Sequence, residues 1–87
     1  MGEAYIELFS SAGCQDCDAV KKLLEQFTKQ YINIDFEIVD IAEDSSRAEE
    51  YGIISVPSIV INGELLFAGE VPEPNKLEEA IKNELHS

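Results

Sequence analysis

The chain has 87 residues, 45% of them hydrophobic, which suits one small domain with a modest core. Its formal net charge of −12 opposes association with nucleic-acid phosphates and with anionic lipids. The sequence has no run of about 18 apolar residues that could span a bilayer. We therefore expect neither a nucleic acid nor a membrane as a partner. The amino terminus lacks the pattern of a secretory signal, which favours a cytoplasmic location.

The first half of the chain predicts two strands and two helices. Residues 4–9 are β-prone and end at a Ser-Ser-Ala-Gly loop, so they predict a first strand. Apolar residues at helical spacing then predict a helix over about residues 14–29, with its apolar stripe at Cys17, Val20, Leu24 and Phe27. Residues 34–41 alternate as a second strand, and Asp44 or Ser45 can cap a short helix that ends before Gly52.

The second half predicts a hairpin and a closing helix. Residues 56–61 and 64–68 flank Asn62-Gly63, the dipeptide that best forms a type I′ turn between antiparallel strands. The last helix has Pro74 near its start, Asn75 and Glu78 as a capping pair, and an apolar face. The order βαβαββα predicts a single α/β domain over residues 1–87, with a four-stranded mixed sheet flanked by three helices.

The two cysteines of the chain stand three residues apart in Cys14-Gln15-Asp16-Cys17. Cys14 falls at the first position or cap of the predicted helix, where backbone N–H groups and the helix dipole lower the pKa of a thiol. Cys17 lies one turn inside and should be the more buried. An activated Cys14 would attack a disulfide and Cys17 would resolve the mixed disulfide. The carboxylates of Asp16 and Asp18 oppose this activation and should make it mild.

Two other interpretations of the cysteine pair stay open on spacing alone. Structural zinc generally needs four ligands, whereas the chain has one Cys-x-x-Cys and a single histidine, His86. A metal ion or cluster would therefore have to be shared between two subunits. Simple packing of two small apolar residues is the other interpretation.

Two motifs in this order resemble the thioredoxin and glutaredoxin superfamily across essentially the whole chain: Cys14-Gln15-Asp16-Cys17 at the start of a helix, and Ser55-Val56-Pro57-Ser58 before a hairpin. Residues 51–63 are especially similar to small, glutaredoxin-sized thioredoxins of methanogenic archaea. The resemblance implies a thioredoxin fold with a cis Val56-Pro57 bond beside the cysteines. Val56 and Pro57 thereby become candidate substrate-binding residues.

Three departures from the family pattern affect the expected chemistry. Gln15 and Asp16 replace the usual dipeptides between the cysteines, so they are the candidates that tune the cysteine pKa, and neither family's redox potential transfers. Leu8 stands where thioredoxins place a buried aspartate that accepts the resolving cysteine's proton, so Glu7, Asp16 or water would have this role. The stretch after Gly69 lacks the glutathione-binding pattern of glutaredoxins.

The resemblance implies a protein disulfide oxidoreductase that acts as a monomeric electron carrier. It would reduce protein disulfides, have no bound cofactor and no metal, and receive electrons from a separate thioredoxin-reductase-type donor, because the chain has no Gly-rich nucleotide loop. The alternatives are a glutathione-dependent glutaredoxin, a metal or cluster-binding module that uses the same cysteines, and a redox-inert adaptor.

Overall fold

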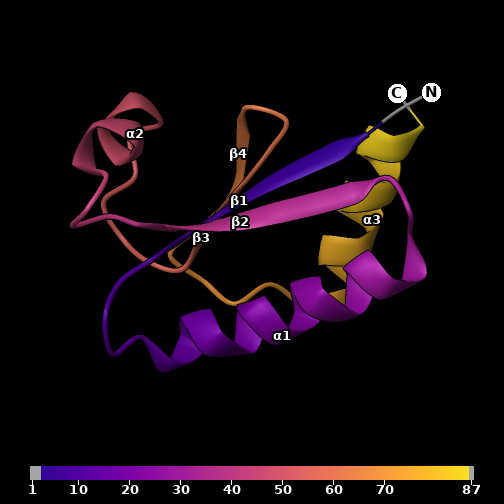
Figure 1. Cartoon of the computed structure of the whole chain (residues 1–87), viewed down its shortest axis with the longest axis horizontal. Coiled ribbons are helices and arrows are strands. Elements are labelled where there is room, and N and C mark those ends of the chain that lie inside the picture. The colour runs from indigo at the N-terminus through magenta and orange to yellow at the C-terminus, as the bar shows by residue number, and fades with distance from the viewer. Residues whose placement is uncertain (1–2, 87) are drawn as a thin grey trace.

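The structure, a computed structural model of the chain, describes residues 3–86. In chain order these residues form β1 (Ala4–Ser10), α1 (Gln15–Gln30), β2 (Ile34–Asp40), α2 (Ser45–Glu50), β3 (Ser58–Ile61), β4 (Glu64–Ala68) and α3 (Pro74–Leu85) (Figure 1). The predicted order of strands and helices is confirmed. Among the described residues, no helix has both the length and the apolar character that a membrane span requires.

The four strands form one mixed sheet in the order β2-β1-β3-β4. The central strand β1 runs parallel to β2 and antiparallel to β3, and β4 returns antiparallel to β3. The register pairs Phe9 of β1 with Ser58 of β3, and Ser58 with Ala68 of β4. The carboxyl ends of β1 and β4 and the amino end of β3 therefore meet at the same end of the sheet.

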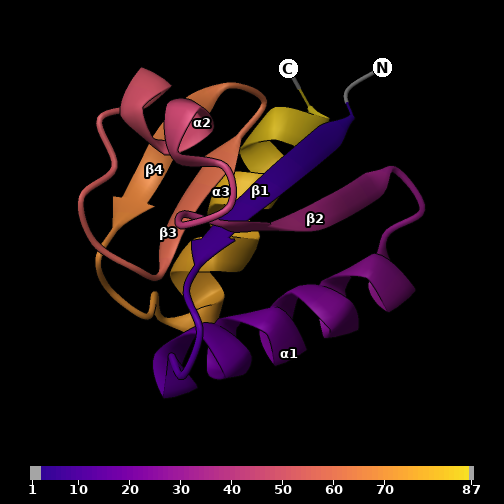
Figure 2. The same cartoon turned by 60° about the vertical axis from the view of Figure 1, so that its left-hand side comes forward.

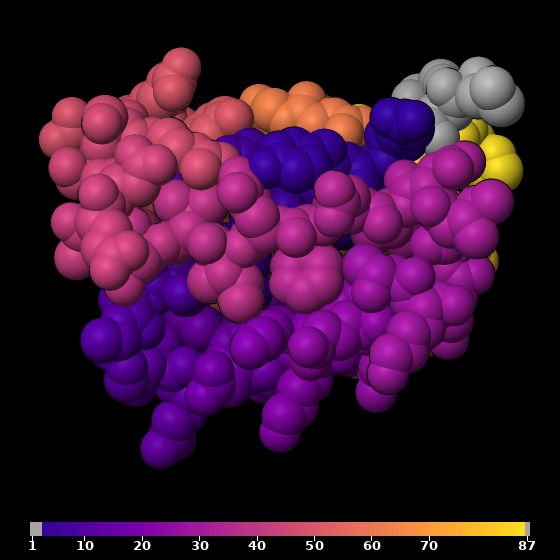
Figure 3. All heavy atoms as spheres, in the orientation of Figure 1, coloured from indigo at the N-terminus to yellow at the C-terminus, as the bar shows by residue number. Residues whose placement is uncertain are grey.

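The helices cover the two faces of this sheet. Figure 2 shows α1 and α3 on one face and α2 on the other. Alternation along β1 sends Ile6 and Leu8 into the core beneath α1 and α3, where they pack with Leu24 and Ile81. Phe9 belongs to a second cluster beneath α2. Figure 3 shows β2 on the surface of this side of the molecule, with α1 below it, β1 above it and α2 at the left.

The apolar stripe of α1 is confirmed by burial. The buried side chains of the helix are Cys17, Val20, Leu24 and Phe27. Their 3-4-3 spacing keeps them on one side of a helix with 3.6 residues per turn, and this side faces the sheet. The stripe therefore fixes the rotation of α1 about its axis and turns Cys17 inward.

The hairpin between β3 and β4 has the predicted turn. Asn62 and Gly63 both have positive φ values, of 50° and 83°, as a type I′ turn requires. The Asn62 side chain also accepts from the Tyr5 N–H at 2.8 Å, which joins the turn to the central strand. The first hairpin strand is shorter than predicted and begins at Ser58, because Val56 and Pro57 form a separate turn before it.

The predicted capping pair of the last helix is wrong. Glu73 is the N-cap of α3, with no side-chain cap hydrogen bond, and Pro74 occupies the first helical turn. Proline has a fixed φ and no N–H, which suits the first helical position, so the helix begins before Asn75 can cap it. The carboxylate of Glu78 instead accepts a hydrogen bond from the Tyr31 hydroxyl at 2.7 Å.

Candidate functional site

Cys14 and Cys17 form a disulfide at the amino end of α1, with their Cα atoms 5.3 Å apart. Cys14 is the N-cap residue and has extended backbone angles, while Cys17 lies in the first turn of the helix. The loop after β1 thus delivers one sulfur to the helix tip and the helix supplies the other. The predicted positions of both cysteines are confirmed.

A backbone hydrogen bond points at the Cys14 sulfur. The N–H of Cys17 donates to Cys14 Sγ at a donor–acceptor distance of 3.1 Å, so the sulfur fills the place that a serine or aspartate oxygen takes at other N-caps. In the reduced protein, the same N–H and the positive end of the α1 dipole favour negative charge on Cys14. This geometry suits a nucleophilic thiolate.

The two cysteines differ in exposure, as predicted. Cys17 is only 4% exposed, whereas Cys14 is partly exposed. The intervening Gln15 and Asp16 are exposed and contribute nothing to the core. A molecule in solution therefore reaches Cys14 more easily than Cys17.

The Val56-Pro57 bond is cis, as the sequence resemblance implied. Pro57 is fully buried and Val56 is partly exposed. Just before them, Ile54 is 96% exposed. This segment leads into β3 at the end of the sheet where β1 leaves for Cys14.

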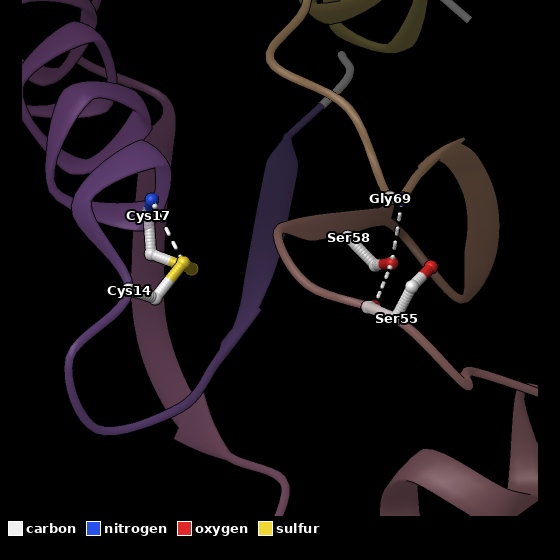
Figure 4. The surroundings of a disulfide bond; sticks show 5 residues. All are labelled: Cys14, Cys17, Ser55, Ser58 and Gly69. Carbon is white, nitrogen blue, oxygen red and sulfur yellow. Dashed lines mark hydrogen bonds between the residues drawn. A yellow bond between two sulfur atoms is a disulfide. The ribbon is translucent and has the colours of Figure 1, made fainter.

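Ser58 joins the Val56-Pro57 turn to Gly69, in the surroundings of the disulfide (Figure 4). Its hydroxyl donates to the Ser55 carbonyl oxygen at 2.8 Å and accepts from the Gly69 N–H at 3.2 Å. The Gly69 N–H also donates to the Pro57 carbonyl oxygen at 2.8 Å. The sequence alone predicted no role for Ser58, although its position directly after Pro57 was an available signal.

The structure removes Glu7 from the candidate proton acceptors. Glu7 is 5% exposed and lies on the α2 face of the sheet, opposite the face that packs against α1. Its carboxylate accepts from the Arg47 guanidinium and, at 3.0 Å, from the Tyr51 hydroxyl. The hydrogen bond to Glu7 raises the pKa of Tyr51. Leu8, its neighbour in β1, is the residue that faces the α1 side, and it carries no proton acceptor.

A second carboxylate completes this polar cluster. Glu37 of β2 accepts from Arg47 and from the Tyr5 hydroxyl, each at 2.5 Å. These hydrogen bonds, chiefly the one from Tyr5, lower the pKa of Glu37. The cluster ties α2 to β1 and β2, and thereby anchors the helix that precedes the Val56-Pro57 turn.

Residues 3–86, which the structure describes, contain no group of three or more His, Cys, Asp or Glu side chains that could hold a metal ion.

Comparisons with known proteins agree with this arrangement. A family model described as "Thioredoxin domain" matches residues 4–82. The "Thioredoxin" of Methanocaldococcus jannaschii is 40% identical over 86 residues, which is 98% of this chain and 100% of that protein. A "Probable Thioredoxin" of Methanothermobacter thermautotrophicus is 38% identical over 92% of this chain and 94% of its own length.

Solved structures show the same fold at lower sequence identity. A mutant thioredoxin from Halobacterium salinarum superposes with a TM-score of 0.82 at 20% identity, covering 97% of this chain and 76% of that chain. Oxidised mitochondrial thioredoxin 3 from Saccharomyces cerevisiae gives a TM-score of 0.75 at 23% identity, covering 95% of this chain and 80% of that chain.

Proposed function

Because the chain belongs to the thioredoxin family, we propose that Cys14 and Cys17 are the reactive dithiol of a protein disulfide reductase. The chain is a thiol-disulfide oxidoreductase, as the thioredoxins it matches over nearly its full length indicate. One observation carries the assignment of roles: the Cys14 sulfur accepts the Cys17 N–H at the tip of α1, while Cys17 itself is buried.

In the first step, the Cys14 thiolate attacks one sulfur of a substrate disulfide. A bond forms between Cys14 Sγ and that sulfur, the substrate S–S bond breaks, and the other substrate sulfur leaves as a thiolate that takes up a proton. The product is a mixed disulfide. The partial exposure of Cys14 and the hydrogen bond on its sulfur support this role.

In the second step, Cys17 loses its proton and attacks Cys14 Sγ. The mixed disulfide breaks, the second substrate sulfur leaves as a thiolate and is protonated, and the Cys14–Cys17 disulfide forms. Two electrons and two protons have then passed from the protein dithiol to the substrate. We assign the proton of Cys17 to water or to Asp16, because Glu7 lies on the opposite face of the sheet.

Val56 and Pro57 are the proposed substrate-binding residues. Val56 is partly exposed and lies at the sheet end to which β1 brings the cysteine loop, so an extended substrate segment could pair with its backbone. Gln15 and Asp16 lie between the cysteines and are the proposed residues that tune the Cys14 thiol. The exposed carboxylate of Asp16 opposes negative charge on that sulfur.

We further propose a monomeric, cytoplasmic carrier that acts as one domain over residues 1–87. The matched family model spans most of this length. The redox-active disulfide is then the sole reactive group, with no bound cofactor. A separate thioredoxin-reductase-type donor returns two electrons and two protons to the oxidised pair.

The roles are tested with Cys14→Ser and Cys17→Ser variants and oxidised insulin. Cys17→Ser is expected to accumulate a mixed disulfide through Cys14, which intact mass spectrometry detects as an adduct released by dithiothreitol. Cys14→Ser is expected to form none and to reduce no insulin. Equal adduct formation by both variants would contradict the assignment of the attacking and resolving cysteines.

A further inference from the structure

Ser58 is one of two buried polar or charged side chains in residues 3–86, with an exposure of 1%. A buried hydroxyl destabilises a protein unless it is hydrogen-bonded. Ser58 meets this requirement with one bond as donor and one as acceptor, to Ser55 and Gly69. The hydroxyl therefore has defined partners on two segments, the turn that carries Val56-Pro57 and the residue that follows β4.

The two segments approach each other closely at this point. A Cβ atom on Gly69 would collide with Ser55 Oγ and lie 3.2 Å from Ser55 Cβ. The Gly69 N–H reaches the Pro57 carbonyl oxygen and the Ser58 hydroxyl together. Figure 4 shows the Ser58 hydroxyl between Ser55 and Gly69 in the surroundings of the disulfide. The Ser58 hydroxyl thus forms one hydrogen bond within the turn, to Ser55, and one to the segment after β4, from Gly69.

We propose that Ser58 is a positioning residue for protein substrates, because its hydroxyl holds the Val56-Pro57 backbone in the orientation that an extended substrate segment pairs with. This inference rests on the proposed role of Val56 and Pro57. Ser58 is too buried to touch a substrate and acts through the turn. A small disulfide needs only access to Cys14, whereas a polypeptide also needs the ordered backbone of Val56. The hydroxyl therefore raises the preference for protein disulfides over small ones.

The test compares reduced wild-type protein with Ser58→Ala under single-turnover conditions, using excess insulin as the protein disulfide and hydroxyethyl disulfide as the small one. The half-saturating insulin concentration is expected to rise about 3- to 10-fold, the range that loss of one hydrogen bond produces. The limiting rate with insulin and the rate with hydroxyethyl disulfide should stay within about twofold of wild type.

A matched pair, Ser58→Thr and Ser58→Val, isolates the hydroxyl, because the two side chains have nearly the same shape. Threonine is expected to keep the wild-type half-saturating insulin concentration, and valine is expected to raise it by the same factor as alanine. Hydrogen exchange at the Gly69 amide is a second measurement on Ser58→Ala. The Gly69 N–H of this variant should exchange faster than the loss of global stability alone predicts. This measurement remains informative if either larger side chain prevents folding.

An unchanged half-saturating insulin concentration in folded Ser58→Ala overturns the proposal. An equal loss of rate with both disulfides also overturns it, since that result means a general structural effect. If wild-type protein reduces neither insulin nor hydroxyethyl disulfide, the proposed function itself fails, which is a separate result from a wild-type reductase that is indifferent to Ser58.

Discussion

The guanidinium of Arg47 on α2 donates to the buried carboxylate of Glu7 on β1. Removing Arg47 would leave that carboxylate, 5% exposed, without its charged partner. We expect Arg47→Met to lower the free energy of unfolding by about 1–3 kcal/mol, less than for a fully buried pair because the Arg47 side chain is partly exposed. Urea unfolding measures the change. Glu37→Gln, which keeps the Arg47–Glu7 pair, should lower the free energy of unfolding by less. An equal loss would show that the burial of Glu7 does not make its pair with Arg47 more stabilising.

The lowered pKa of Glu37 predicts a pH dependence of stability. The hydrogen bonds from Tyr5 and Arg47 hold the folded-state pKa of Glu37 below its ordinary value of 4.5. Its contribution to stability is therefore present above about pH 4.5 and is lost as the pH falls through the folded-state value. Protonation of the 18 acidic groups also relieves charge repulsion, so the comparison must be with Glu37→Gln. The stability difference between wild type and variant should shrink between about pH 6 and pH 3; a constant difference would contradict the shift.

Two glycines with nearly the same φ allow the energetic effect of the close approach between Gly69 and Ser55 to be measured. Gly69 has a φ of 73° and Gly52 a φ of 70°, but a Cβ atom meets Ser55 only at Gly69. Gly52→Ala should cost about 1–2 kcal/mol for the left-handed conformation, and Gly69→Ala should cost more by the displacement of Ser55. Adding Ser55→Ala removes the colliding oxygen and should recover part of the excess in thermal unfolding. An excess that Ser55→Ala does not reduce would contradict the collision with the Ser55 oxygen as its cause, and no excess at all would mean that Ser55 moves aside freely.

The negative charge at the disulfide end predicts a preference among small substrates. Asp16 and Asp18 stand in the first turn of α1 and Glu70 follows Gly69, all exposed. We expect the reduced protein to react about tenfold faster with dicationic cystamine than with dianionic dithiodiglycolate at low ionic strength, and salt should narrow the ratio. Both rates are measured by stopping each reaction at fixed times with an alkylating agent and counting the cysteines that are still free thiols.

A charge-matched pair of variants locates this effect. Asp18→Lys and Glu64→Lys change the net charge equally, but Glu64 begins β4 at the sheet end opposite the disulfide. Asp18→Lys should reduce the ratio of the two rates much more than Glu64→Lys. Equal effects would mean that overall charge alone decides.

Local rules account for what the sequence could predict. The turn at Asn62-Gly63 depends on two residues that tolerate positive φ, and the burial of Cys17 depends on the spacing of one helical stripe, so both could be predicted without the rest of the chain. The predicted cap of α3 was wrong because two local signals compete there: Pro74 favours the first helical turn and Asn75 favours the cap position, and the helix begins at Pro74.

Long-range contacts account for what the sequence could not predict. Glu7 and Leu8 are neighbours in β1, and which of them faces the cysteine side depends on which helix covers which face of the sheet. The partners of Glu7 come from residues 40 and 44 positions away. The acceptor bond of Ser58 likewise involves a residue 11 positions away. No periodicity within a short window contains this information.

The sulfur of Cys14 caps α1, the longest helix of the protein. Reduction of the disulfide therefore changes the group that accepts the capping hydrogen bond. A capping thiolate is a stronger hydrogen-bond acceptor than a disulfide sulfur, because it carries a full negative charge. In the proposed mechanism the reduced protein contains this thiolate, so the stabilisation that α1 gives to the thiolate beyond what it gives to the disulfide sulfur raises the reduction potential. Helix formation and electron transfer are therefore thermodynamically linked, and a substitution that loosens the first turn of α1 will make the protein a stronger reductant without touching either sulfur.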